Sequence, residues 1–172
     1  KARVALQPGP HVGMLVRAVV VHHQMQADLP GELVVQTAQK AQDLEREATL
    51  HYFTRPADDP KKADTNLKEA VTLYKRVVEE FPRTSTAPLA AFHLGNALVQ
   101  ANELDAAIEA YKRFVLMYGS NASLLGLVQQ RLGYVYLLKG DRDQAAKAYS
   151  AVLEIPGALN RDHALFELAR LE

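Results

Sequence analysis

Cysteine is absent from this 172-residue chain. Its absence excludes disulfides, thiol catalysis, thiolate metal sites and covalent haem attachment. Long apolar runs are lacking as well, because no stretch reaches the roughly 18 apolar residues of a membrane-spanning helix. Charge of one sign is also lacking, since 20 basic residues balance 20 acidic ones and the two kinds are mixed along the chain. A protein neutralises phosphates with a basic stripe, so we expect no nucleic-acid partner.

Residue patterns for catalysis or metal binding are equally scarce. His22 and His23 are adjacent, so on a helix they point about 100° apart and share one metal poorly. The paired acids Asp58-Asp59 and Glu79-Glu80 are expected in a loop and on a solvated helix face, with no cleft between them. The glycines do not have the spacing of a phosphate-binding loop. We therefore predict no catalytic residue, no metal site and no cofactor.

The N-terminal 30 residues differ from the rest and are predicted to form an arm. Pro8-Gly9-Pro10 and Gly13 indicate irregular backbone. Residues 14–27 suit a strand by their valine content and a helix by their spacing. We favour the helix, because a lone strand would have no sheet partner. The chain starts at Lys1 rather than Met, which we interpret as a trimmed or processed piece that a signal or anchor could precede.

From residue 31 onward the sequence repeats itself. Leu132-Gly133 follows Leu94-Gly95 by 38 residues, and Ala145 and Tyr149 follow Ala107 and Tyr111 at the same offset. Upstream, Tyr74 precedes Tyr111 by 37 residues, and downstream Phe166 to Ala169 repeats Phe92 to Gly95. Within each copy the apolar residues have helical spacing on both sides of a polar break. A period of this size indicates helical hairpins stacked into a solenoid.

Small residues and tyrosines are expected to organise each hairpin. Gly95 and Ala107, and likewise Gly133 and Ala145, should let two antiparallel helices approach closely. Tyr74, Tyr111 and Tyr149 could be mistaken for a ladder that stacks on a ligand. Their offset from the small residues instead predicts that they fill the hairpin cores.

Local signals predict where helices begin and end. A helix is expected from Glu32 to Phe53, followed by an enlarged loop from Thr54 to Ala63. Asn66 with Glu69, and Asp141 with Gln144, have the spacing of capping boxes at the starts of second helices. Gly140 should end the preceding helix. Asn121 lies in an Asn-x-Ser sequon, and we expect it to act as a helix cap.

These positions resemble the tetratricopeptide repeat, with its Leu-Gly pair, an Ala twelve residues later, a Tyr four beyond, and a closing Pro or Gly. The closing residues here are Pro82, Gly119 and Pro156-Gly157. Three departures stand out: Ala91 replaces a large aromatic, Val77, Phe114 and Val152 replace a small residue, and the period exceeds the usual 34. The spacing is similar to that of bacterial cell-envelope members. These include the Tol–Pal-associated cell-division coordinator, the outer-membrane assembly lipoproteins and the translocon-associated periplasmic chaperone.

The resemblance, which covers roughly residues 64–172, implies an all-α fold. Residues 31–172 would form a right-handed solenoid of about three repeats and a partial fourth, after the arm of residues 1–30. Exposed residues of the first helices would line a concave groove. Mapped onto this sequence, the groove residues are Leu89, Phe92, Asn96, Val99, Gln100, Leu127, Gln130, Tyr134, Leu137, Leu138, Phe166 and Arg170.

The chemistry of these residues suits an extended or helical peptide, because apolar side chains alternate with amides. Relatives that grip a C-terminal carboxylate need Lys and Asn where this chain has Phe92 and Tyr134, which argues against that activity. The competing interpretation is that Phe92, Tyr134 and Leu138 are covered by the chain itself.

We therefore predict a non-catalytic scaffold that binds a partner protein in this groove, in the periplasm or cell envelope by resemblance and otherwise in the cytoplasm. The first alternative is a structural subunit of a stable assembly or oligomer, which would use residues 1–30 and the open fourth repeat. A less favoured class is an enzyme accessory that holds a metal at His22 or His23.

Overall fold

A computed structural model describes residues 31–54 and 56–171. The contacts divide the chain after Gln36, and the packing considered below lies within residues 37–172. Residues 31–36, the described part of the other unit, form the start of a helix. The helix expected over residues 14–27 and the pair His22-His23 lie outside the described residues.

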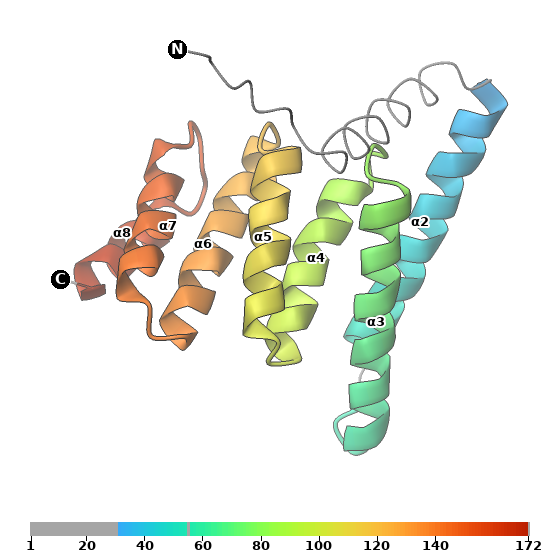
Figure 1. Ribbon diagram of the computed structural model, residues 1–172, viewed down its shortest axis with the longest axis horizontal. Coiled ribbons are helices and arrows are strands. Elements are labelled where there is room, and N and C mark those ends of the chain that lie inside the picture. Colours follow the sequence, from blue (N-terminus) through green and yellow to red (C-terminus); the bar gives the residue numbers. More distant parts are fainter. Residues whose placement is uncertain (1–30, 55, 172) are drawn as a thin grey trace, which may run out of the picture. The chain divides into compact units, whose positions relative to one another are not determined.

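The described residues form helices and no strands, as the sequence predicted (Figure 1). In chain order they are α2 (Gly31–Phe53), α3 (Pro60–Glu80), α4 (Ala87–Gln100), α5 (Leu104–Tyr118), α6 (Ala122–Leu138), α7 (Arg142–Glu154) and α8 (Arg161–Leu171). From α3 onward each helix packs against the next, and α4 also contacts α6. The side chains of α2 reach α3, where Thr49 Oγ1 lies 2.9 Å from the Tyr74 hydroxyl. These are three hairpins and the first helix of a fourth, which confirms the predicted helical-repeat architecture.

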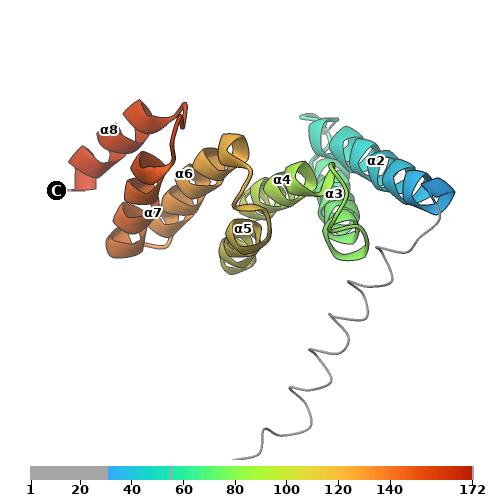
Figure 2. The ribbon, with the colours of Figure 1, turned by 90° about the horizontal axis from the view of Figure 1, so that it is seen from above.

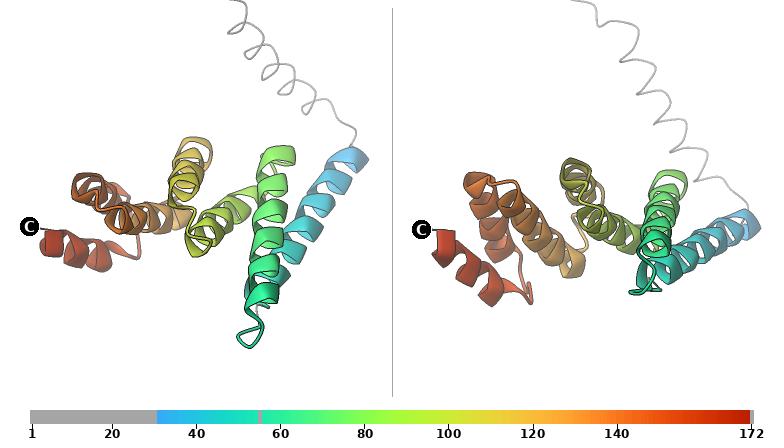
Figure 3. Two further views of the ribbon diagram at one scale, coloured as in Figure 1. Left: turned by 60° about the horizontal axis from the view of Figure 1, so that its bottom comes forward. Right: turned by 90° about the horizontal axis from the view of Figure 1, so that it is seen from below.

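First and second helices of the hairpins lie in separate layers. Figure 2 shows α4, α6 and α8 in one layer and α3, α5 and α7 in the other. The α4–α5 and α6–α7 pairs remain side by side in the two further views of Figure 3. Because α4 contacts α6 directly, the exposed sides of these first helices adjoin and can act as one surface.

The repeated tyrosines lie in the hairpin cores, as predicted. Tyr74 and Tyr111 are fully buried, and Tyr149 is nearly so. Burial raises the pKa of both Tyr74 and Tyr149 to about 12. These phenols therefore stay neutral at physiological pH and contribute packing rather than charge.

The close approach within each hairpin involves different partners from those expected. A Cβ built on Gly95 would lie 2.2 Å from Cε1 of Tyr111, and one on Gly133 would lie 2.8 Å from Cζ of Tyr149. The predicted partners Ala107 and Ala145 are buried, but the nearest atoms to each glycine belong to the tyrosine ring. The absent Cβ thus makes room for an aromatic ring.

Most helix ends follow the local signals. Asp141 accepts a hydrogen bond from the Gln144 backbone N–H at 3.0 Å, and Asn121 accepts one from Leu124 N–H at 3.3 Å. Gly140 has a φ of 78°, a left-handed conformation that costs glycine little. The caps at Asn121 and Asp141 and the helix end at Gly140 are confirmed. The reciprocal bond from the Gln144 side chain that would complete a capping box is absent from the described residues.

The start of α3 was predicted wrongly. The helix begins at Pro60 rather than after Ala63, because Asp59 caps it by accepting a hydrogen bond from Lys62 N–H at 3.0 Å. Proline is tolerated at the first helical position, where its missing N–H would have no partner. Asn66 therefore lies inside the helix and donates to the Thr54 carbonyl at 2.8 Å instead of forming a capping box with Glu69.

None of the helices within the described ranges combines the length and the apolar character needed to cross a membrane.

Candidate functional site

The candidate site is the outward side of α4 and α6, which we call the α4–α6 face. It consists of Leu89, Phe92, Asn96, Val99, Gln100, Leu127, Gln130, Tyr134, Leu137 and Leu138. These residues recur at helical spacing on two helices that contact each other. The structure therefore brings together ten of the twelve residues that the sequence singled out.

Apolar side chains on the α4–α6 face differ in how far they are covered. Phe92 and Val99 are half-buried and pack against the main core, and Leu137 is half-buried against the core of the last hairpin. Leu89 and Leu127 are exposed, as are Tyr134 at 44% and Leu138 at 49%. The expectation of self-packing thus applies to Phe92 in part, whereas Tyr134 and Leu138 remain open to solvent in the described residues.

The three amides of the face have internal partners. Asn96 accepts from the Tyr111 hydroxyl at 2.8 Å, and Gln100 donates to the Tyr52 hydroxyl at 2.5 Å. Gln130 accepts from Asn160 Nδ2 at 2.7 Å. Each amide uses one of its two polar atoms in these bonds.

The internal bonds hold each amide in a defined orientation. Among the hydrogen bonds of the described residues, the other atom of each amide has no partner, so it can bond a partner's backbone. These atoms are Nδ2 of Asn96, Oε1 of Gln100 and Nε2 of Gln130. Orientation fixed before binding reduces the entropy lost when a partner docks.

The two remaining predicted residues, Phe166 and Arg170, lie on α8 and contact each other. The Arg170 guanidinium lies 5.7 Å from the centre of the Phe166 ring, and Arg170 also pairs with Glu167 at 3.2 Å. Both side chains are exposed. Asn160, which lies just before α8, connects this helix to the α4–α6 face. Its Nδ2 atom donates to the Gly126 carbonyl and to Gln130 Oε1.

Sequence reasoning did not anticipate the environment of His93. Its ring stacks on Tyr74 with centroids 5.5 Å apart, and the rings of Tyr52, Phe53 and Phe92 lie within 6.3 Å. The Nδ1 atom is buried and has no hydrogen-bond partner among the described residues. Burial lowers the pKa of His93, while the Glu45 carboxylate opposes the shift.

This aromatic cluster joins the first hairpin to the second through a neutral imidazole. The adjacent pairs Tyr52-Phe53 and Phe92-His93 were its sequence signal. Their separation by about forty residues concealed it, because only the packing of α2 on α4 brings them together.

Among residues 31–54 and 56–171, no group of three His, Asp or Glu side chains converges as a metal site would require. Among the described histidines, His51 lies closest to a carboxylate. Its Nδ1 atom is 3.0 Å from Oε2 of Glu69 on the neighbouring helix. This arrangement is an ion pair when the histidine is protonated, and it offers a metal too few ligands.

Comparison with known proteins identifies the repeats. A model of the tetratricopeptide repeat family matches residues 90–121, which cover most of α4 and all of α5, and residues 128–158, which cover most of α6 and all of α7. No curated protein matches the chain. The two matches coincide with the two hairpins that carry the α4–α6 face.

Proposed function

Because this chain is a tetratricopeptide repeat protein, we propose that it is a non-catalytic scaffold that binds a segment of a partner protein on the α4–α6 face. The observation that carries the proposal is the exposure of Tyr134 and Leu138 beside amides whose orientation is already fixed. Exposed apolar side chains supply affinity when they are covered, and the free amide atoms can pair with a peptide backbone. Phe166 and Arg170 would extend the contact onto α8.

Binding on this face needs little reorganisation of the scaffold. Phe92 and Val99 already pack against the core, and the three amides are already bonded. The cost of ordering falls mainly on the partner segment, so the buried area of Tyr134 and Leu138 contributes more fully to affinity.

Site-specific photocrosslinking in the native cells tests the proposal. A photoreactive benzoyl-phenylalanine replaces Tyr134 in one variant and Leu116 of α5 in the control. Leu116 is also apolar and is 86% exposed, but it lies outside the α4–α6 face. We expect a discrete adduct with another polypeptide at position 134 and none at position 116. Equal adducts at both positions, or an adduct at 116 alone, would contradict the proposed face.

A structural subunit of an assembly is the second candidate. It is favoured by α8, where Leu165 and Phe166 are exposed at 54% and 61%. The same crosslinker at Leu165 distinguishes the two functions. An adduct with twice the mass of the chain at 165, together with none at 134, would favour the assembly subunit.

We also propose a bacterial cell envelope as the location, from the resemblance in repeat spacing alone. Fractionation of the native cells tests this point independently. Recovery with the periplasmic or envelope fraction is expected, and recovery with the cytosol would refute the location without affecting the binding face.

A further inference from the structure

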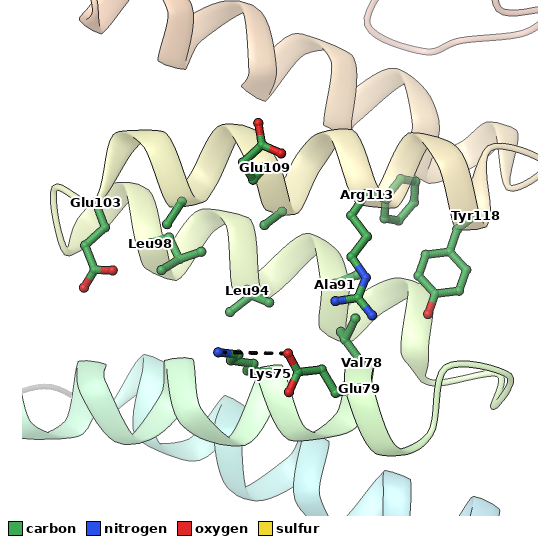
Figure 4. A pocket seen from close by; sticks show the side chains of 13 residues that line it. Lys75, Val78, Glu79, Ala91, Leu94, Leu98, Glu103, Glu109, Arg113 and Tyr118 are labelled. Atoms are coloured by element: carbon green, nitrogen blue, oxygen red, sulfur yellow. Dashed lines mark ion pairs between the residues drawn. The ribbon is translucent and has the colours of Figure 1, made fainter. Parts of the chain in front are cut away.

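A hollow opens on the other side of the second hairpin, between α3, α4 and α5 (Figure 4). Its volume is about 420 Å³. Ala91, Leu94 and Leu98 of α4 form the floor, and Val78 of α3 and Ala110 of α5 stand on either side. We call this feature the α3–α5 hollow. Its size is within the range of pockets that bind ligands or anchor side chains.

The hollow exists because two side chains are smaller here than at the corresponding positions of the next hairpin. The residue that corresponds to Ala91 in the next hairpin, 38 positions later, is Gln129, and the residue that corresponds to Leu98 is Tyr136. Both are half-buried, so larger side chains occupy the corresponding place between α5 and α7. Tyr136 packs against both hydrophobic clusters. The α3–α5 hollow is thus a feature of this hairpin's residues rather than of the repeat backbone.

The hollow and the α4–α6 face lie on opposite sides of α4. At 3.6 residues per turn, the direction of Ala91, Leu94 and Leu98 is about 150° from that of the residues on the α4–α6 face. A ligand in the hollow would therefore leave that face free. Binding here is independent of the proposed function.

Two charged side chains at the ends of the hollow, Arg113 and Glu103, form no ion pair within the described residues. Arg113 Nε donates to Met117 Sδ at 3.4 Å, and no carboxylate lies within ion-pair distance of Arg113 in the described part of the chain. Figure 4 shows its side chain extended from α5 toward α3. Glu103, at the opposite end, immediately precedes α5 without a side-chain cap bond. It has no ion pair in the same ranges, and the opposing charge that acts on it is the Lys68 ammonium, which is itself paired with Asp64.

The other charges around the hollow are already paired. Lys75 lies 4.0 Å from Glu79, and Glu109 lies 3.3 Å from Lys112. The rim therefore offers one cation at one end and one anion at the other. Arg113 presents a planar fork that suits a carboxylate, and Glu103 suits a lysine or arginine.

The separation of these ends indicates the kind of ligand. Ten residues of helix separate Glu103 from Arg113, which is about 15 Å at the rise of an α-helix. An extended peptide covers that length in about four or five residues. A peptide can therefore place an apolar side chain on the floor while its flanking charges reach both ends.

We propose that the α3–α5 hollow binds an extended segment of a partner protein through one large apolar side chain. This side chain lies on Ala91, Leu94 and Leu98. An acidic residue of the segment pairs with Arg113, and a basic residue four or five positions away pairs with Glu103. The pattern follows from charge complementarity with the two unpaired ends and from the apolar floor between them.

Selection from a random dodecapeptide library displayed on phage tests the pattern. The intact chain is the target. Peptides that also bind an Ala106→Gln variant, in which the hollow is filled, are discarded by counter-selection because they bind elsewhere. Ala106 is exposed at the edge of the hollow, and the corresponding residue of the next hairpin is Gln144, so the repeat accommodates this side chain. Ala91→Gln, which copies Gln129, is a second filling variant. We expect peptides with one large apolar residue between an acid and a base.

Affinity measurements on a selected peptide then assign its orientation. The chain contains no tryptophan, so a peptide with Trp at the apolar position reports binding by its own fluorescence. Ala106→Gln should weaken binding about tenfold or more, the usual effect of losing a buried anchor. Arg113→Glu should also weaken it, and replacing the peptide's acid by lysine should restore binding to that variant alone. Leu116→Ser, at an exposed side chain of α5 that does not line the hollow, should leave the affinity unchanged.

Three results would overturn the proposal. The first is a set of selected peptides without the paired charges. The second is an affinity that neither Ala106→Gln nor Arg113→Glu changes. The third is a concentration-dependent dimer of the chain, seen by sedimentation and abolished by Ala106→Gln, because a second copy would then occupy the hollow.

Discussion

The ring of Tyr111 lies directly over Gly95, so closely that a Cβ on the glycine would come within 2.2 Å of ring atom Cε1. Tyr111 is fully buried, and its hydroxyl donates to Asn96 on the same side of α4 as the candidate site. One glycine thus allows an aromatic core residue to reach through the hairpin and orient an amide on the binding face.

Gly95→Ala is expected to destabilise the chain. The added methyl group would overlap the Tyr111 ring, so the packed core must shift, which typically costs about 1–3 kcal/mol. The better helix propensity of alanine offsets up to about 1 kcal/mol of this. Gly133→Ala, where the nearest ring atom is 2.8 Å away, should cost less. Urea denaturation measures both free energies of unfolding. If the ring contact is the cause, Gly95→Ala should cost little when Tyr111 is also replaced by Leu, and an unchanged cost would refute it.

Two substitutions separate the contributions of the Tyr111 ring and of its hydroxyl to the free energy of unfolding. Tyr111→Ala should lower the free energy of unfolding by about 3–5 kcal/mol, as for other buried aromatics. Tyr111→Phe keeps the ring and removes only the bond to Asn96, so about 1 kcal/mol is expected. Thermal and urea denaturation check both values. Equal losses for the two variants would show that the ring contributes little.

His93 should make stability depend on pH. Burial lowers its pKa in the folded chain below the ordinary value of 6.5. The unfolded chain therefore binds a proton first as pH falls, and stability decreases from about pH 6.5 down to the folded pKa, where the loss levels off. Above pH 6.5 both states are neutral at this residue and nothing is lost.

The comparison of unfolding free energy between the native chain and His93→Phe, from pH 8 to pH 5, isolates this contribution. Phenylalanine fits the aromatic surroundings and cannot be protonated. The variant should lose less stability on acidification than the native chain. Parallel pH curves for the two proteins would rule out His93 as the source.

The two aspartate caps should each stabilise a second helix. Asp59→Ala and Asp141→Ala remove side chains that accept backbone N–H bonds at the starts of α3 and α7. A loss of about 1 kcal/mol is expected for each, as for other N-cap substitutions. Asp58→Ala is the matched control, because this neighbouring loop carboxylate does not cap a helix. A control loss as large as that of Asp59→Ala would mean that net charge, rather than capping, is responsible.

Local signals misplaced α3 for a physical reason. Proline was taken to exclude helix through Ala63, whereas Pro60 occupies the first helical position and Asp59 supplies the cap. Asp59-Pro60 and Asn66-Glu69 were competing starts of comparable chemistry. The earlier start prevailed because it extends the helix and leaves Asn66 free to bond the Thr54 carbonyl across the turn.

The repeat register was enough to list the residues of the candidate site. It did not predict how exposed each side chain is or which hydrogen bonds it forms. Phe92 and Tyr134 are both aromatic residues on first helices, and one is half-buried while the other is exposed. The difference depends on neighbours from other hairpins, which the register alone does not supply. The amide partners Tyr52 and Asn160 likewise come from 48 and 30 residues away.

The sequence by itself determined the helical hairpins, their caps at Asn121 and Asp141, and the burial of the three tyrosines. These follow from periodicity and backbone chemistry within about one repeat, which are local properties. Only the tertiary structure decided that His93 would be enclosed by four aromatic rings, that the amides would be bonded internally, and that Ala91 would leave a hollow. Those outcomes depend on which side chains from different hairpins fill or fail to fill shared space, and a linear pattern does not specify that volume.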